Sequence, residues 1–541
     1  MDTSARFARY LHFRSVVDDP FVELDLSHSA LQLADIEALS PALGRALAAM
    51  TDLEAGAIAN PDEGRQVGHY WLRAPGMAPD EGVQESIRSV IDDLQAFAAD
   101  VHSGRISPPE GGAFAKVVLC GIGGSALGPM LLADAFGGAT MGAAGSIEAP
   151  MALTVLDNTD PEGIDEKIQR VGGLQDALVI VISKSGGTPE TRNGMLEVRR
   201  AVEAQGLSFA PRAIAITMDG SKLHQLATGE GWLKTVPMWD WVGGRTSITS
   251  AVGLLPGALL GMDIRAFLAG AAAMDDATRR TEILANPAAM LAAFWHHEGR
   301  DASGACKGER AMVVLPYKDR LVLLSRYLQQ LVMESLGKEN DRSGHVVEQG
   351  LAVYGNKGST DQHAYVQQLR DGRHDFFATF VRVLQDRPGA AEPAAQRFEV
   401  EPGVTAGDYL DGFFQGTRRA LFDKGRRSAT IAVDHLDERV LGSLVALFER
   451  TVSIYAELID TNAYHQPGVE AGKKAAGEVL DLQHRLVAAL GTEPRDVAAL
   501  AAAVTADPAD CWPVLQHLAA NREEIAVVHG HDPAAATFFL R

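Results

Sequence analysis

The run Asp176-Ala-Leu-Val-Ile-Val-Ile182, followed at once by Ser183-Lys-Ser-Gly-Gly-Thr188 and a proline, decides the fold of this chain. Val and Ile without polar alternation are typical of a strand buried on both faces of a parallel sheet. The glycines and the proline that follow predict a turn into a helix. At the end of such a strand, helix N–H groups and the hydroxyls of Ser183, Ser185 and Thr188 would surround a bound phosphate. The alternative is a plain turn in which Thr188 is only the helix N-cap.

Further strands are expected on both sides of this one in the sequence. They lie at 116–120, 152–156 and 213–217, and a second group lies at 311–316, 375–381 and 428–433, with a helix over 320–337. Strands that alternate with helices in this way indicate α/β domains of the doubly wound type with mainly parallel sheets. We expect four parts: a helical N-terminal segment (1–110), a first α/β domain (111–260), a second (261–480) and a helical C-terminal extension (481–541).

The composition indicates a soluble globular enzyme: 46% of the 541 residues are hydrophobic and 22% are charged. A formal net charge of −21 argues against nucleic acid or an anionic membrane as the main partner. The three cysteines, Cys120, Cys306 and Cys511, are too widely spaced for a disulfide framework or a CxxC metal site. We expect a cytoplasmic protein, because no apolar leader is evident and the longest apolar region, roughly 248–274, is interrupted by charges and a proline.

A glycine turn, Gly121-Ile-Gly-Gly-Ser125, follows the expected strand at 116–120. With Ala126 it fits a relaxed dinucleotide-binding pattern, and Asp157 follows the next strand, where a ribose-binding acid could lie. Gly124 and Ser125 would serve equally well as donors to a sugar phosphate. A turn that serves only close packing is the third interpretation.

Glu334 and Arg245 are the first two candidates for chemistry. Gln330 precedes Glu334 by four residues and so shares its helical face, and a partly buried carboxylate there could act as a general base. Arg245 lies in a double-glycine turn, where its guanidinium could bind an anion or a developing oxyanion with two N–H groups. The plainer interpretations are a solvated surface carboxylate and an arginine that ties a loop to an acid.

Three further candidates follow along the chain. His363 could shuttle protons near neutral pH, although a lone loop histidine is more often structural. Gln466 and Lys473 are seven residues apart and could face one side of a helix that begins near Pro467, although an exposed lysine is the commoner case. The pair His296-His297 lacks the HExxH spacing, so we interpret it as packing and expect no metal site.

Taken in order, the segments over roughly 115–480 resemble the phosphoglucose isomerase family, whose members are built from two sugar-isomerase (SIS) domains. The resemblance rests on Gly121–Ser125, Ser183–Thr188, Gly243-Gly-Arg-Thr-Ser247, Gln329-Gln-Leu-Val-Met-Glu-Ser-Leu-Gly-Lys338, Gln362-His363 and Gln466-Pro-Gly-Val-Glu-Ala-Gly-Lys473. Two positions depart from the commonest pattern: Thr246 replaces an aromatic residue, and Tyr464-His-Gln-Pro467 replaces Phe-Asp-Gln-Trp. These departures resemble the branch of the family that is also found fused to transaldolase.

The resemblance implies an aldose–ketose isomerase that interconverts glucose 6-phosphate and fructose 6-phosphate through a cis-enediol, with no cofactor and no metal. It implies that Ser183, Ser185, Thr188, Ser125 and the Lys184 backbone hold the phosphate, and that His363 and Lys473 assist ring opening. Glu334 would then transfer the proton between C2 and C1 while Arg245 stabilises the negative charge. Gln330, Gly244 and Gln466 would orient the intermediate, and Gly124 would be a further substrate-binding residue. His363 would come from the partner subunit of a homodimer with composite active sites.

Three alternatives to this activity stay open from the sequence. One is a dual phosphoglucose/phosphomannose isomerase, since Thr246 changes the wall of the site. Another is a catalytically silent SIS-domain sensor of sugar phosphate, which the joint presence of Glu334, Arg245, His363 and Lys473 disfavours. The third, a nicotinamide-dependent dehydrogenase, rests on the glycine turn alone.

Overall fold

The strand expected at 176–182 is the middle strand of a five-stranded sheet in the computed structural model, which describes residues 3–136, 150–301, 303–389, 393 and 397–541. All of its neighbours pair in parallel, in the order β4-β3-β5-β6-β7. The strands are β3 (Lys116–Cys120), β4 (Ala152–Leu156), β5 (Ala177–Ile182), β6 (Ala213–Thr217) and β7 (Lys234–Pro237). The prediction of a parallel α/β sheet in this part of the chain is confirmed.

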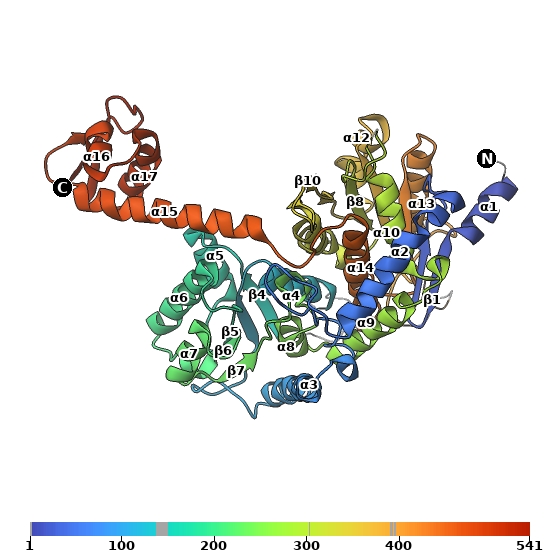
Figure 1. The fold of residues 1–541 in the computed structure, drawn as a ribbon. Helices are drawn as coiled ribbons and strands as arrows, with labels where there is room; N and C mark the ends of the chain where they lie inside the picture. Colours follow the sequence, from blue (N-terminus) through green and yellow to red (C-terminus); the bar gives the residue numbers. More distant parts are fainter. Residues whose placement is uncertain (1–2, 137–149, 302, 390–392, 394–396) are drawn as a thin grey trace. The chain divides into compact units, whose positions relative to one another are not determined.

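Both faces of this sheet are covered, which explains the unbroken apolar run. Leu178, Ile180 and Ile182 belong to one buried cluster, and Val179 and Val181 belong to another. One face is covered by the helices α5 (Pro161–Val171), α6 (Pro189–Ala204) and α7 (Lys222–Gly229) (Figure 1). The other face is covered by α3 (Glu81–His102), α4 (Gly124–Phe136) and α8 (Ala251–Leu259). Two short 3₁₀ turns, η2 (Ala210–Arg212) and η3 (Gly244–Thr246), complete this part.

The second sheet has six strands in the order β1-β2-β13-β12-β8-β11. Four are parallel, as expected: β8 (Ala311–Pro316), β11 (Val353–Tyr354), β12 (Phe376–Val383) and β13 (Ser428–Val433). The other two, β1 (Arg14–Asp18) and β2 (Phe21–Asp25), form a hairpin that pairs antiparallel with β13. The N-terminal segment is therefore not only helical, since it adds this hairpin to α1 (Thr3–His12), α2 (Leu33–Glu54), η1 (Pro75–Met77) and α3. The strands are five residues long and their partner is distant in sequence, so the local pattern did not reveal them.

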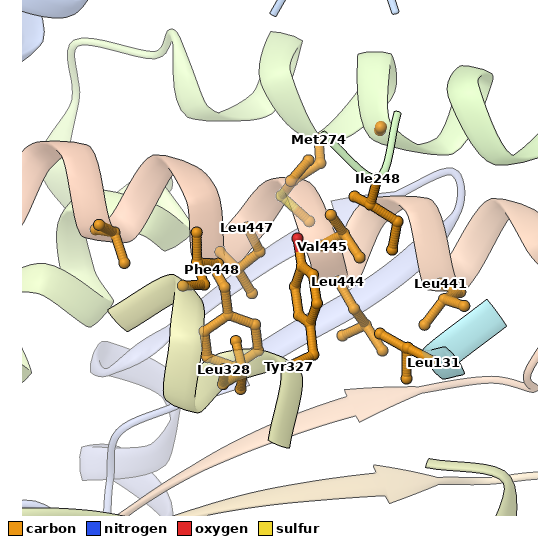
Figure 2. Packing of buried hydrophobic residues seen from close by; sticks show 14 of the residues in the cluster. Leu131, Ile248, Met274, Tyr327, Leu328, Leu441, Leu444, Val445, Leu447 and Phe448 are labelled. Carbon is orange, nitrogen blue, oxygen red and sulfur yellow. The ribbon is translucent and has the colours of Figure 1, made fainter. Parts of the chain in front are cut away.

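Helix α14 (Glu438–Leu458) lies at the centre of the main core and is buried along nearly its whole length. A helix that is buried on every side needs neighbours all around it. Figure 2 shows these neighbours close by: Leu131 from α4, Met274 from α9 (Ile264–Thr278) and Tyr327 from α11 (Leu324–Leu328). The helices η4 (Ile283–Ala285) and α10 (Pro287–Glu298) complete this layer.

The helix expected over 320–337 is not one regular helix. It begins as the 3₁₀ turn η5 (Asp319–Leu321), continues as α11, and widens into the π-helical turn η6 (Gln329–Glu334). Such π-turns are frequent at functional sites because they re-aim side chains at little cost to the rest of the helix. After it come β9 (Lys338–Asn340), β10 (Val346–Gln349), η7 (Thr360–His363), α12 (Val366–Asp371) and α13 (Ala406–Phe422).

The described chain forms two compact units, Met1–His465 and Gln466–Arg541. The second has its own core, with Leu486, Leu500 and Phe538 fully buried. It holds α15 (Pro467–Ala489), α16 (Val497–Val504) and α17 (Pro508–Asn521), and also a three-stranded antiparallel sheet of β14 (Arg495–Asp496), β15 (Ile525–Val528) and β16 (Thr537–Leu540). The expected helical extension thus contains strands as well, and the boundary expected at 480/481 lies inside the continuous helix α15.

No helix among the described residues is both long enough and apolar enough to cross a membrane.

Candidate active site

The loop after β5 gathers the three hydroxyls that the sequence singles out. The Ser183 hydroxyl donates to Oγ1 of Thr188 (3.1 Å), and Oγ of Ser185 accepts from the backbone N–H of Gly187 (3.2 Å). Thr188 occupies the N-cap position of α6, yet its side chain makes no capping hydrogen bond. The N–H groups of the first turn are thus left without a side-chain cap, beside three hydroxyls. This arrangement favours an anion site over a plain capped turn.

Gly186 holds this loop in a shape that other residues resist. Its φ angle is +67°, and a Cβ at this position would lie 2.3 Å from the backbone nitrogen of Leu223. The loop therefore lies directly against the start of α7, and a side chain at residue 186 would push it away.

Lys184 ties the same loop to the double-glycine turn. Its ammonium donates to the carbonyls of Asp240 (2.5 Å) and Val242 (2.9 Å), which directly precede that turn. Burial, together with repulsion from Arg65, lowers the pKa of Lys184 to about 8. The sequence had given a role only to the Lys184 backbone. Its side chain adds a second one, because it joins the hydroxyl loop to the segment that carries Arg245.

The two glycine turns touch each other. Gly124 begins α4 and Gly244 begins η3, and a Cβ on Gly124 would lie 1.9 Å from the carbonyl oxygen of Gly244. The Ser247 hydroxyl donates to that same oxygen (2.7 Å), and Ser125 follows in the first turn of α4. This close approach of the two backbones explains why residue 124 is a glycine.

Asp157, the residue that a dinucleotide site would use for ribose, is engaged elsewhere. Its carboxylate pairs with Lys167 (2.8 Å) and with Arg326 (3.7 Å). These partners weaken the dehydrogenase alternative.

Glu334, Gln330 and Arg245 meet at one carboxylate oxygen. Oε2 of Glu334 accepts from Nε2 of Gln330 (3.1 Å) and pairs with Nε of Arg245 (3.2 Å). The Glu334 side chain is 21% exposed, so it remains accessible to a substrate. The Gln330 amide also lies against the glycine turn, 3.0 Å from where a Cβ on Gly123 would be. The sequence grouped Gln330 with Glu334, and their contact is confirmed.

Arg245 is almost fully buried and is held by acceptors on both sides. It donates from Nη1 to Oγ of Ser335 (3.3 Å) and the Ala463 carbonyl (3.0 Å), and from Nη2 to the His465 carbonyl (3.3 Å). Burial lowers the pKa of Arg245 from its ordinary value, and the Glu334 carboxylate opposes that shift. An arginine stays charged nonetheless, so a fixed cation lies beside the candidate base.

Lys338 is a site residue that sequence reasoning did not single out. Its ammonium donates to the carbonyls of Glu334 (2.7 Å) and His465 (3.0 Å). Burial and the charge of Arg245 lower the pKa of Lys338 to about 7. Its position four residues after Glu334 was the available signal, since that spacing brings side chains to neighbouring turns.

The remaining predicted residues come from other segments of the chain. His363 ends η7 on the surface, where its neighbour Gln362 donates to the Phe413 carbonyl (3.1 Å). In the described part of the chain, no hydrogen bond or ion pair joins His363 to Glu334. Gln466 and Lys473 belong to the second unit, at the start of α15, and their roles stay predictions.

Within the described residues, no group of three or more His, Cys, Asp or Glu side chains is arranged to hold a metal ion. The histidine pair at 296–297 lies in α10, where His297 contacts the carboxylate of Glu298 (3.2 Å).

Known proteins resemble this chain over most of its length. Residues 32–397 and 416–490 match the family model described as phosphoglucose isomerase. A glucose-6-phosphate isomerase of Geobacter sp. (strain M21) is 54% identical over 511 residues, covering 93% of each chain. One from Cyanothece sp. (strain PCC 7425 / ATCC 29141) is 52% identical over 532 residues, covering 97% of each.

A solved structure of a glucose-6-phosphate isomerase from Chlamydia trachomatis has the same fold, with a TM-score of 0.76 at 24% identity over 88% of this chain and 91% of that one. The fold and the relatives together define the class of this protein as a two-sheet α/β isomerase. More particularly, the chain belongs to the phosphoglucose isomerase family.

Proposed function

We propose that this chain interconverts glucose 6-phosphate and fructose 6-phosphate in glycolysis and gluconeogenesis. The observation that carries the proposal is the contact of Arg245 with Glu334 at 3.2 Å, a fixed cation beside a partly exposed carboxylate. An aldose–ketose isomerisation needs this combination, because a proton must leave a carbon next to a carbonyl while negative charge develops on oxygen.

The phosphate is bound at the loop after β5. Ser183, Ser185 and Thr188 donate to its oxygens, together with Ser125 and the backbone of Lys184. The uncapped start of α6 supports this role, since its N–H groups favour an anion. Binding at this end fixes the sugar by the group that takes no part in the reaction, so that C1 and C2 reach the base.

Glu334 removes the proton from C2 of the open-chain aldose as the C1 carbonyl oxygen gains charge, which gives the cis-enediol. Glu334 then returns that proton to C1, and the C2 hydroxyl becomes the ketose carbonyl as its own proton passes to the oxygen on C1. Arg245 stabilises the enediolate charge. Gln330, Gly244 and Gln466 orient the intermediate, and Gly124 also binds the substrate. The hydrogen bond from Gln330 to Oε2 of Glu334 supports the role of Gln330.

Ring opening precedes this step and is assisted by His363 and Lys473. His363 acts in the partner's site, so the enzyme is a homodimer with composite active sites. The exposed position of His363 supports this proposal, because a side chain at the surface is available to a second subunit. The compartment is the cytoplasm, which suits three free cysteines, of which Cys120 and Cys511 are buried.

An assay of the purified protein tests the activity. Fructose 6-phosphate is supplied without added metal, and glucose 6-phosphate is followed with a coupled dehydrogenase. We expect turnover of fructose 6-phosphate. A second assay with mannose 6-phosphate as substrate tests the dual phosphoglucose/phosphomannose isomerase alternative, which requires turnover of both sugars. Binding of fructose 6-phosphate without turnover would overturn the proposal in favour of a sugar-phosphate sensor.

A further inference from the structure

Part of the orientation of Arg245 comes from a loop outside the helical segment that carries Glu334 and Ser335. Two of its acceptors are the carbonyls of Ala463 and His465, in the segment that follows α14. Lys338 donates to the same His465 carbonyl and to the Glu334 carbonyl. The position of the arginine, and through it that of the Glu334 carboxylate, therefore depends on what holds residues 461–465.

That loop is held by Asn462, which is 4% exposed. Its amide nitrogen donates to Oδ1 of Asn60 (3.0 Å) and to Oδ2 of Asp62 (2.5 Å), while its amide oxygen accepts from the backbone N–H of Tyr464 (2.9 Å). One side chain thus serves as donor to another segment and as acceptor within its own loop. Only a neutral amide supplies both groups at this size.

Asn60 completes the contact from the N-terminal segment and is also 4% exposed. Its backbone forms a bridge with Arg65, which closes a short turn, and its amide nitrogen approaches the Tyr464 carbonyl (3.4 Å). Two buried asparagines about 400 residues apart in sequence therefore clamp the loop whose carbonyls orient Arg245.

The contact between Asn60 and Asn462 affects Arg245 through the loop carbonyls that bind its guanidinium. A pocket lies beside the guanidinium, and its walls include Asn60, Tyr464 and Ser335. The guanidinium donates to the carbonyls of Ala463 and His465. A shift of the carbonyls would therefore move the guanidinium, and small displacements of a catalytic group cost rate.

We propose that Asn60 and Asn462 are positioning residues for the isomerisation, acting through the Ala463 and His465 carbonyls on Arg245. This inference rests on the proposed function of Arg245 at the enediolate. It assigns a role in the reaction to the N-terminal segment, in which the sequence shows no motif.

The first test is Asn462→Asp, which keeps the acceptor for Tyr464 but removes both donor bonds and places a carboxylate against Asp62. We expect kcat for fructose 6-phosphate to fall by about 10- to 100-fold, and KM to change by less than about threefold, because the phosphate loop is untouched. The double variant Asp62→Asn with Asn462→Asp exchanges donor and acceptor, and should recover most of the lost kcat.

Asn60→Ala approaches the pair from the other side and should lower kcat in the same way. Each change is also made in an Arg245→Lys background, where a residue that acts through Arg245 should have little further effect. If each change lowers kcat by the same factor in the wild-type background and in the Arg245→Lys background, the inference is contradicted.

The matched control is Asn286→Asp at the N-cap of α10. Asn286 is fully buried and its amide nitrogen also donates twice, to the carbonyls of Thr278 (2.7 Å) and Arg280 (2.8 Å). It should lower the melting temperature and leave kcat of the folded enzyme unchanged. If Asn462→Asp and Asn60→Ala behave like this control, the positioning role is wrong while the isomerase function stands. A wild-type protein without turnover would instead reject the proposed function, and the positioning role with it.

Discussion

The carbonyl oxygen of Gly244 occupies the space that a side chain at Gly124 would need, 1.9 Å from the Cβ position. The turn that opens α4 and the turn that carries Arg245 are therefore in direct backbone contact. Gly124→Ala should force them apart, with a stability loss of about 1–3 kcal/mol, as is typical of overpacking, and a fall in kcat. Gly44→Ala in α2 is the control, since nothing lies within 4 Å of its Cβ position. Urea unfolding and steady-state kinetics on both variants check this.

Replacing the base should separate binding from turnover. Glu334→Gln keeps an acceptor near Gln330 and Arg245 but cannot take a proton, so we expect kcat to fall by roughly 10²–10⁴-fold with sugar phosphate still bound. Glu339→Gln, an exposed neighbour in β9, should behave like the wild type. Activity of Glu334→Gln within a few fold of the wild type would mean that another group is the base.

The hydroxyl loop should govern affinity for the phosphate. Ser185→Ala together with Thr188→Ala removes two donors to a charged group, each worth about 1.5–3 kcal/mol, so KM for fructose 6-phosphate should rise steeply. Inorganic phosphate should compete with substrate in the wild type and lose potency in the double variant. Thr228→Ala, at the end of α7, is the control for loss of a hydroxyl. Undiminished phosphate inhibition in the double variant would move the anion site elsewhere.

Mixed dimers test whether two chains share each site. Glu334→Gln subunits and His363→Ala subunits are each expected to be nearly inactive alone. After subunit exchange, about half of the dimers carry one chain of each kind, and in these one site receives both intact residues. Activity should return to about a quarter of the wild-type value, on the basis of two-fold symmetry. No recovery after verified exchange would show that each chain supplies its own histidine.

Lys338 should change how the free energy of unfolding depends on pH. Burial lowers its pKa to about 7 in the folded protein from an ordinary value of 10.5. Between these values the unfolded chain keeps a proton that the folded protein has released, so raising the pH favours the folded protein. The free energy of unfolding should therefore rise with pH above about 7 relative to Lys338→Gln. Urea unfolding of both proteins from pH 6 to 9 checks this, and parallel curves would contradict it.

Sequence patterns predicted those parts of the candidate site whose residues are close together in the sequence. The buried strand β5 and the hydroxyls after it are adjacent in sequence, and Gln330 meets Glu334 because they are four residues apart. Lys184 was predicted for its backbone only, because its carbonyl acceptors lie more than fifty residues away. The contact of Asn60 with Asn462 joins segments that carry no motif, so no pattern in either one pointed to it.

The fold was predicted to a similar extent. The parallel strands were recognisable from their unbroken apolar runs, whereas the hairpin β1–β2 and the sheet of the second unit are short and depend on distant partners. The π-turn η6 differs from a regular α-helix in its backbone hydrogen bonds, which join residues five apart instead of four. The spacing of apolar side chains did not reveal this difference.

The hairpin also sets an order of events during synthesis. Val22–Asp25 pair with Thr430–Val433, so β2 leaves the ribosome some 400 residues before its partner β13 is made. The five-stranded sheet, complete at residue 237, has all its strands long before then. Because domains fold as their chain becomes available, the middle of this protein should acquire structure before its beginning does. At translation rates of about 5–20 residues per second, β2 remains without its partner β13 for some tens of seconds, the interval in which a nascent-chain chaperone could act on the hairpin.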